Sequence, residues 1–167
     1  MEGAEGVGAS SMAGEEPRPW VVDDLRLEDR EAWARLHRGY LDFYESTRPD
    51  EVSAIVWGWL TDPHHELECL VVRATPGSEP VGIAHFRPFI RPLQGSVAGF
   101  LDDLFVSPAH RGTGAVDALL AGVRARARDR GWPIVRWITR ESNSRARSTY
   151  DRLARQTDLV TYELPAD

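Results

Sequence analysis

A glycine-containing turn is the stretch of this chain best suited to hold a ligand. It runs through Arg111, Gly112, Thr113 and Gly114, between a strand-like apolar run and a helix-like run. Such a turn leaves backbone N–H groups without intrahelical partners at a helix N-terminus, where the helix dipole is positive. Glycine permits both the tight path and the close approach of an anion. The pattern predicts a pyrophosphate site, and a plain connector between strand and helix is the alternative.

Two common phosphate-binding motifs do not describe this turn. It is not followed by the Gly-Lys-Ser/Thr of a P-loop, and it is not the G-x-G-x-x-G of dinucleotide-binding folds. The chain contains no lysine at all, because all twenty of its basic residues are arginine. The absence of lysine also excludes Schiff-base chemistry.

The elements that must position the turn alternate between strand-like and helix-like runs. Strands are expected over 21–25, 67–73, 80–88, 97–106, 134–139 and 160–164. Helices are expected over 27–44, 51–60, 116–130 and 143–156, because apolar residues recur there at helical spacing. The order predicts a mixed α/β fold, with one sheet and helices packed on it.

Length and composition predict one globular domain. The chain has 167 residues, of which 42% are hydrophobic and 28% charged. Residues 1–17 are rich in Gly, Ala, Ser and Glu, so we expect a disordered tail followed by a single domain over 18–167. No apolar run approaches the roughly 18 residues that a membrane helix needs.

Net charge and cysteine content limit which classes of partner and which cellular location we expect. The formal net charge is −6, which gives no indication of a nucleic-acid or membrane partner. The single cysteine, Cys69, lies in an apolar run and is interpreted as a small buried residue, with a nucleophile as the alternative. A reducing, cytoplasmic location fits this pattern best.

The turn also carries a family resemblance. The run 111–116, Arg-Gly-Thr-Gly-Ala-Val, resembles the Q/R-x-x-G-x-G/A signature with which the GNAT superfamily of N-acetyltransferases binds the pyrophosphate of acetyl-CoA. Val116 departs from the signature, since Gly or Ala is usual there. Residues 101–106 look like the strand before the signature in polyamine acetyltransferases. The run from Trp137 to Tyr150 resembles the W-x-T-x-x-x-N-x-x-A-x-x-x-Y pattern of fungal-type histone and D-amino-acid acetyltransferases.

This resemblance implies a GNAT fold, in which a mixed, mostly antiparallel sheet is flanked by helices, and acetyl-CoA as co-substrate. The backbone of 104–106 would pair with the pantetheine arm, and one N–H there would polarise the acetyl carbonyl. The positions that would bind the coenzyme are Leu104, Phe105, Val106, Arg111, Gly112, Thr113, Gly114, Ala115, Val116, Asp117 and Asn143. Asn143 is also suited to cap a helix, which is compatible with the same role. No metal is expected.

The resemblance also implies two catalytic groups. Tyr150 would protonate the departing thiolate of CoA, and a core aromatic is the alternative. A carboxylate would accept the proton of the attacking amine. Asp102 and Asp103 are adjacent in a strand and are expected to face opposite sides, so only one can face a cleft. By resemblance we assign this role to Asp102, with a solvated pair of acids as the alternative.

The chain is therefore predicted to be an acetyl-CoA-dependent N-acetyltransferase that acts by direct attack of a small-molecule amine. An amino acid, a polyamine or a related metabolite is the expected substrate, and a protein amine is the alternative. A second alternative is a non-catalytic acyl-CoA-binding module. A homodimer is compatible with the family. Other side chains that could line the substrate side are Tyr40, Tyr44, Trp57, His64, His65, His85 and Glu141.

Overall fold

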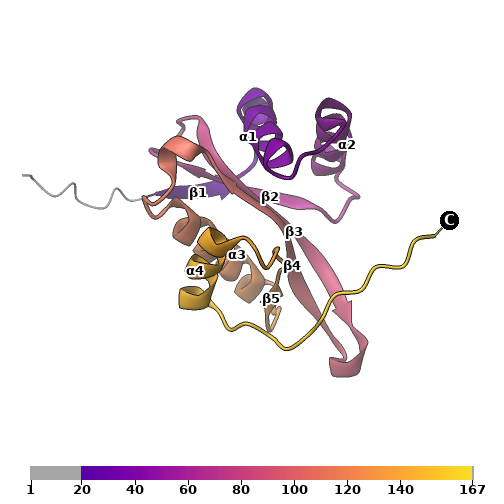
Figure 1. Cartoon of the computed structure of the whole chain (residues 1–167). Helices are drawn as coiled ribbons and strands as arrows, with labels where there is room; N and C mark the ends of the chain where they lie inside the picture. The colour runs from indigo at the N-terminus through magenta and orange to yellow at the C-terminus, as the bar shows by residue number, and fades with distance from the viewer. Residues whose placement is uncertain (1–19, 167) are drawn as a thin grey trace, which may run out of the picture. The chain divides into compact units, whose positions relative to one another are not determined.

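The computed structural model describes residues 20–166 (Figure 1). The tail predicted to be disordered, residues 1–17, lies outside the described residues. The chain divides into two compact units, one ending at Arg136 and the other beginning at Trp137.

The first unit contains a five-stranded sheet in the order β1-β2-β3-β4-β5. Neighbouring strands are antiparallel from β1 to β4, whereas β4 and β5 are parallel. This arrangement confirms the predicted mixed, mostly antiparallel sheet. The strands are β1 Val21–Asp24, β2 Glu68–Arg73, β3 Pro80–Arg91, β4 Ser96–Val106 and β5 Val135–Arg136.

Three helices cover this sheet, with α1 (Arg30–Phe43) and α2 (Pro49–Thr61) over one face and α3 (Ala115–Asp129) over the other (Figure 1). Helices α1 and α3 bury an apolar stripe against the sheet, whereas α2 packs mainly against α1 and leaves Ile55 and Trp59 exposed. Along α1 the buried residues recur at helical spacing, namely Ala32, Trp33, Leu36, His37 and Leu41. The three helices confirm the predictions for 27–44, 51–60 and 116–130 within a few residues at each end.

A glycine brings α1 unusually close to the sheet. A Cβ added at Gly39 would lie 2.8 Å from the ring of Phe105 in β4. Any side chain there would push the helix away from the strand, so glycine is required for this close approach. This part of α1 therefore lies against the C-terminal end of β4.

The second unit holds one helix, α4 (Ser144–Leu153), and an extended C-terminal run. Two of the predicted strands differ from the structure, one in its length and the other because no strand forms. The strand predicted over 134–139 is reduced to the two residues of β5, and 160–164 forms no strand. The apolar side chains of that run are exposed, namely Leu159, Val160, Tyr162 and Leu164. Alternation of apolar residues is a local pattern, whereas a strand exists only where a second strand supplies backbone hydrogen bonds.

Two further predictions concern single features. Cys69 is buried, and burial raises the pKa of its thiol far above the usual range, which confirms a packing residue rather than a nucleophile. Among the described helices, none is both long enough and apolar enough to cross a membrane.

Candidate active site

The glycine turn connects β4 to α3 as predicted. Strand β4 ends at Val106, and α3 begins at Ala115 with Gly114 as its N-cap residue. Gly112 and Gly114 have φ values of +79° and +88°, in the left-handed region that favours glycine. A Cβ added at Gly112 would meet no atom within 4 Å, so the backbone there borders open space.

Side-chain hydrogen bonds fix the path of this turn. Arg111 Nε donates to the carbonyl oxygen of Val106 at 3.1 Å, and Trp20 Nε1 donates to that of Thr113 at 2.7 Å. Thr113 Oγ1 in turn donates to the carbonyl oxygen of His110 at 2.6 Å. All three bonds end on carbonyl oxygens. They therefore do not occupy the first-turn N–H groups of α3, which can donate to other acceptors. A rigid turn with free space at Gly112 fits an anionic group such as a pyrophosphate.

The other coenzyme-binding positions predicted in α3 lie in its first turn. Ala115 is buried in the core, whereas Val116 and Asp117 are half-buried. Val116, the departure from the family signature, thus lies at the margin of the core rather than within it.

The end of β4 has an open edge. On one side it pairs with β3 along its length, but on the other it pairs with β5 only through Gly99 and Phe100. Leu104, Phe105 and Val106 therefore lie beyond the last paired residue on that side, within the part of the chain that the structure describes. Backbone N–H and C=O groups at an open edge can pair with the amide groups of an extended ligand.

The two predicted acids lie at an irregularity of β4. Asp103 is opposite His85 of β3, but the next paired residues are Leu101 and Phe86, so Asp102 is an extra residue. The expectation that the two acids face opposite sides assumes a regular strand, and a bulge of this kind breaks the alternation. The charges of both Asp102 and Asp103 act on the hydroxyl of Tyr40, so both carboxylates lie near one group.

Asp102 is half-buried and lies beside one cation. Arg87 Nε is 3.2 Å from its Oδ2. Burial raises the pKa of Asp102 above its usual value, as does the neighbouring charge of Asp103, and Arg87 only partly offsets this. A carboxylate with a raised pKa is the better proton acceptor of an adjacent pair.

Asp103 is hydrogen-bonded to an imidazole and a phenol instead of a guanidinium group. Its Oδ2 lies 2.8 Å from Nδ1 of His85, and the hydroxyl of Tyr40 also hydrogen-bonds to it. Burial acts to raise the pKa of Asp103, but the bonds from His85 and Tyr40 outweigh burial and hold this pKa below its usual value. Asp103 is therefore ionised over the physiological pH range.

Behind Asp103 lies a buried aromatic cluster that the sequence did not indicate. Trp33 Nε1 donates to His85 Nε2 at 2.9 Å, and His37 stacks on Trp33 with ring centroids 4.7 Å apart. Ser53 Oγ is 2.9 Å from Nδ1 of His37. His85 and Tyr40 are among the side chains predicted to line the substrate side, whereas Trp33 and His37 are not among the predicted site residues. The cross-strand position of His85 opposite an acid was the available signal.

The second unit holds the other two predicted site residues. Asn143 is the N-cap of α4, where its side chain accepts a hydrogen bond from the backbone N–H of Ala146 at 3.3 Å. Its capping role is thereby confirmed. Tyr150 lies two turns further along α4, and its ring meets that of Trp137 edge to face at 5.2 Å. The other predicted site residues all belong to β4, the turn and α3 in the first unit.

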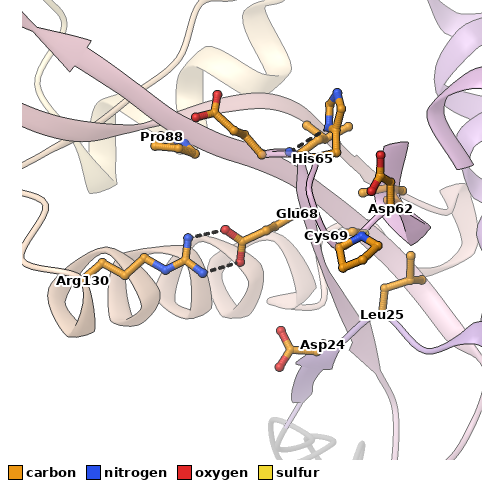
Figure 2. Close-up of a pocket in the computed structure, with 12 residues that line it drawn as sticks. Asp24, Leu25, Asp62, His65, Glu68, Cys69, Pro88 and Arg130 are labelled. Atoms are coloured by element: carbon orange, nitrogen blue, oxygen red, sulfur yellow. Dashed lines mark hydrogen bonds and ion pairs between the residues drawn. The ribbon is translucent and has the colours of Figure 1, made fainter. Parts of the chain in front are cut away.

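A separate pocket of about 480 Å³ lies at the other end of the sheet (Figure 2). Acidic residues on its wall include Asp24, Asp62 and Glu68. Glu68 forms a two-pronged ion pair with Arg130, which Figure 2 shows as two dashed lines. Arg126 also bonds to Glu68 and to Asp24, so the charges of these two acids are compensated within the protein. The pocket contains none of the predicted site residues.

Comparisons with known proteins agree on one family. The model of the acetyltransferase (GNAT) family matches residues 33–154. The D-amino-acid N-acetyltransferase HPA3 of Saccharomyces cerevisiae is 29% identical over 157 residues, which cover 91% of this chain and 98% of that protein.

Solved structures show the same fold. A ribosomal-protein-alanine N-acetyltransferase from Brucella melitensis biovar Abortus 2308 has a TM-score of 0.72 and 25% identity, over 88% of this chain and 99% of that one. The aminoglycoside acetyltransferase AAC(6')-Iy, in complex with a bisubstrate analogue containing CoA, has a TM-score of 0.75 at 16% identity, over 89% and 99%.

Proposed function

The chain belongs to the acetyltransferase (GNAT) family, and we propose that it transfers the acetyl group of acetyl-CoA to a primary amine of a small molecule. The observation that carries this proposal is the continuous unit of open β4 edge, glycine turn and α3 N-terminus. The yeast relative acts on D-amino acids, which supports an amino acid or a similar small amine as substrate. A cytoplasmic location stays a prediction.

The coenzyme would be held by two backbone features. The N–H groups at the start of α3, with Gly112 and Gly114, would bind the pyrophosphate, because that end of the helix is electropositive and sterically open. The open edge at Leu104–Val106 would pair with the amide groups of the pantetheine arm. Acetyl-CoA, when bound, supplies the acetyl group as a thioester.

Two side chains would move protons. Asp102 would accept a proton from the acceptor amine, since its raised pKa makes it the more basic of the two adjacent acids. Tyr150 would donate its phenolic proton to the departing thiolate, because the two groups have comparable basicity. Asn143 would fix the start of the helix that carries Tyr150 and contact the pantetheine arm.

Binding and turnover can be tested separately. Calorimetric titration should detect acetyl-CoA binding, and a thiol-release assay over a panel of amines should identify one class that turns over. Binding without turnover on any amine would favour an acyl-CoA-binding module. Failure to bind acetyl-CoA would overturn the proposal.

Tyr150→Phe tests the proton donor. We expect turnover to fall by roughly 10²-fold or more while acetyl-CoA binding is unchanged. Tyr162→Phe is the matched control, because Tyr162 is 89% exposed and makes the same chemical change. Equal turnover in the two variants would contradict the assignment of Tyr150.

A further inference from the structure

Two buried groups, Trp33 and His85, lead from the core to the acid pair. Trp33, 1% exposed, donates its indole N–H to Nε2 of His85, which is fully buried. The other ring nitrogen of His85, Nδ1, lies 2.8 Å from Oδ2 of Asp103. No role has so far been given to Trp33 or His85 in the proposed reaction.

Trp33 determines the tautomer of His85. The indole nitrogen can only donate a hydrogen bond, so Nε2 of His85 must be the acceptor and cannot carry a proton. The proton of the neutral ring then lies on Nδ1 and points at Asp103. His85 is thereby a fixed neutral donor to this carboxylate.

A metal ion is the main rival interpretation of this cluster. The ligand atoms of His37, His85 and Asp103 lie within 4.8 Å of one another. A metal on Nδ1 of His85 would require the ring proton on Nε2, where it would face the indole N–H of Trp33. Two donors facing each other in a buried site are unfavourable, so Trp33 disfavours metal coordination.

Asp103 consequently keeps a negative charge that no cation compensates directly. Its partners in the described part of the chain, His85 and Tyr40, are neutral, whereas Arg87 pairs with Asp102. The side chain of Asp103 is 22% exposed, so a ligand can reach it. Beside it, the ring of Tyr40 packs against that of Tyr44 at 4.9 Å. A carboxylate next to aromatic rings is suited to bind an organic cation.

We propose that Asp103 and Tyr40 bind the acceptor amine in its ammonium form, and that Trp33 and His85 are positioning residues that hold Asp103 for this contact. This inference rests on the proposed acetyl transfer. The two acids at the bulge then have different roles. Asp103 binds the ammonium group, and Asp102 removes its proton. The expected ligand class is a primary alkylammonium ion.

Asp103→Asn is the first test, because it removes the charge and keeps the shape. The KM for the amine should rise about 100-fold, while the KM for acetyl-CoA stays within twofold. Asp42→Asn is the matched control, since Asp42 lies on the exposed side of α1 and pairs with Arg38. An amine KM unchanged by Asp103→Asn would overturn the proposal.

Trp33→Phe tests the positioning step. It removes the N–H donor and keeps an aromatic ring, so the amine KM should rise roughly three- to tenfold with kcat nearly retained. Trp132→Phe makes the same change against Gly99, elsewhere on the sheet, and should leave the amine KM unchanged. A loss of kcat with no change in amine KM would assign Trp33 a purely structural role.

Binding of a cation that cannot be acetylated separates this inference from the proposed function. Tetramethylammonium chloride should perturb the indole N–H signal of Trp33 in the NMR spectrum of the wild type and not in Asp103→Asn. This readout requires no turnover, so it holds even if no amine is acetylated. No response in the wild type would overturn the cation site, whatever the enzymatic assay shows.

Discussion

Asp29 and Asp103 are both largely buried carboxylates in the same unit, and their partners differ in charge. Asp29 is 6% exposed and lies 2.6 Å from a guanidinium nitrogen of Arg73, which is itself 2% exposed. Arg73 also donates to the carbonyl oxygen of Ser78 and lies beside Asp23. Asp103 has the neutral donors His85 and Tyr40 and keeps part of its surface accessible.

The difference separates a structural pair from a binding group. In the Arg73 cluster the carboxylates of Asp29 and Asp23 are balanced by the guanidinium groups of Arg73 and Arg26, so no net attraction remains for a ligand. Around Asp103 the hydrogen-bond partners are an imidazole and a phenol, with no guanidinium among them, so the carboxylate keeps its negative charge at an accessible position. Of these two carboxylates, Asp103 is therefore the one suited to bind a cationic ligand.

Breaking the Arg73–Asp29 pair should have the largest effect on stability. Arg73→Met leaves Asp29 buried without its cation, which should lower the free energy of unfolding by about 3–5 kcal/mol. Urea unfolding monitored by circular dichroism measures this change. The amine KM of the remaining folded enzyme should not change, in contrast to Asp103→Asn.

The double variant Arg73→Met/Asp29→Asn is the control for this prediction. Removing both charges relieves the uncompensated carboxylate, so the double variant should be more stable than Arg73→Met alone. A loss below about 1 kcal/mol in Arg73→Met would mean that the Arg73–Asp29 pair contributes no more to stability than a solvent-exposed ion pair.

Acid should weaken the histidine cluster next to Asp103. Burial lowers the pKa of His37 from 6.5 to about 4. The folded state therefore binds fewer protons than the unfolded state between these two values. Stability is complete above about pH 6.5 and decreases as the pH falls to about 4, by roughly 3 kcal/mol in all.

His37→Asn isolates this contribution. The variant loses the stacking on Trp33 and is less stable at every pH, but its unfolding free energy should vary less between pH 4 and pH 6.5. Thermal unfolding across that range gives both curves. Parallel curves for the wild type and the variant would show that His37 does not titrate as described.

Salt should weaken amine binding if the accessible charge of Asp103 attracts the amine. Raising the ionic strength from about 0.05 M to about 0.5 M should increase the amine KM roughly two- to threefold, because ions screen the attraction to Asp103. Steady-state kinetics in Asp103→Asn provides the reference, where the amine KM should be insensitive to salt. Equal salt dependence of the amine KM in the wild type and in Asp103→Asn would mean that a residue other than Asp103 attracts the amine.

The exposed ion pair at the pocket in Figure 2 should contribute least. Arg130→Gln removes one partner of Glu68, but Arg126 still bonds to that carboxylate. The free energy of unfolding should fall by less than about 1 kcal/mol, as is usual for solvent-exposed pairs. A loss as large as that of Arg73→Met would mean that the Arg130–Glu68 pair stabilises the fold as much as the buried Arg73–Asp29 pair does.

Most of the fold could be predicted from local patterns. Apolar periodicity located α1, α2 and α3, and the strands from β1 to β4, within a few residues. The strand predicted over 160–164 failed, because its partner must come from a distant part of the chain and no local pattern specifies one. β5 is shortened for the same reason, since only Gly99 and Phe100 of β4 pair with it.

The glycine turn could be predicted for a similar reason, whereas the acid pair could not. The turn depends on backbone angles that glycine alone favours at 112 and 114. A regular β3–β4 hairpin would place Asp102 opposite His85, and the register shift puts Asp103 there instead. The environment of each acid depends on this one-residue shift, which the sequence does not reveal.

The tautomer of His85 tests the central claim most directly. Ring nitrogen NMR of ¹⁵N-histidine-labelled protein at neutral pH reports which nitrogen carries the proton. We predict a proton on Nδ1 and an unprotonated Nε2, because Trp33 occupies Nε2 as a donor. A proton on Nε2 alone would mean that His85 does not donate to Asp103, and protons on both nitrogens would make His85 a cation that compensates this carboxylate. Either result would contradict the assignment of Asp103 as the ammonium-binding group.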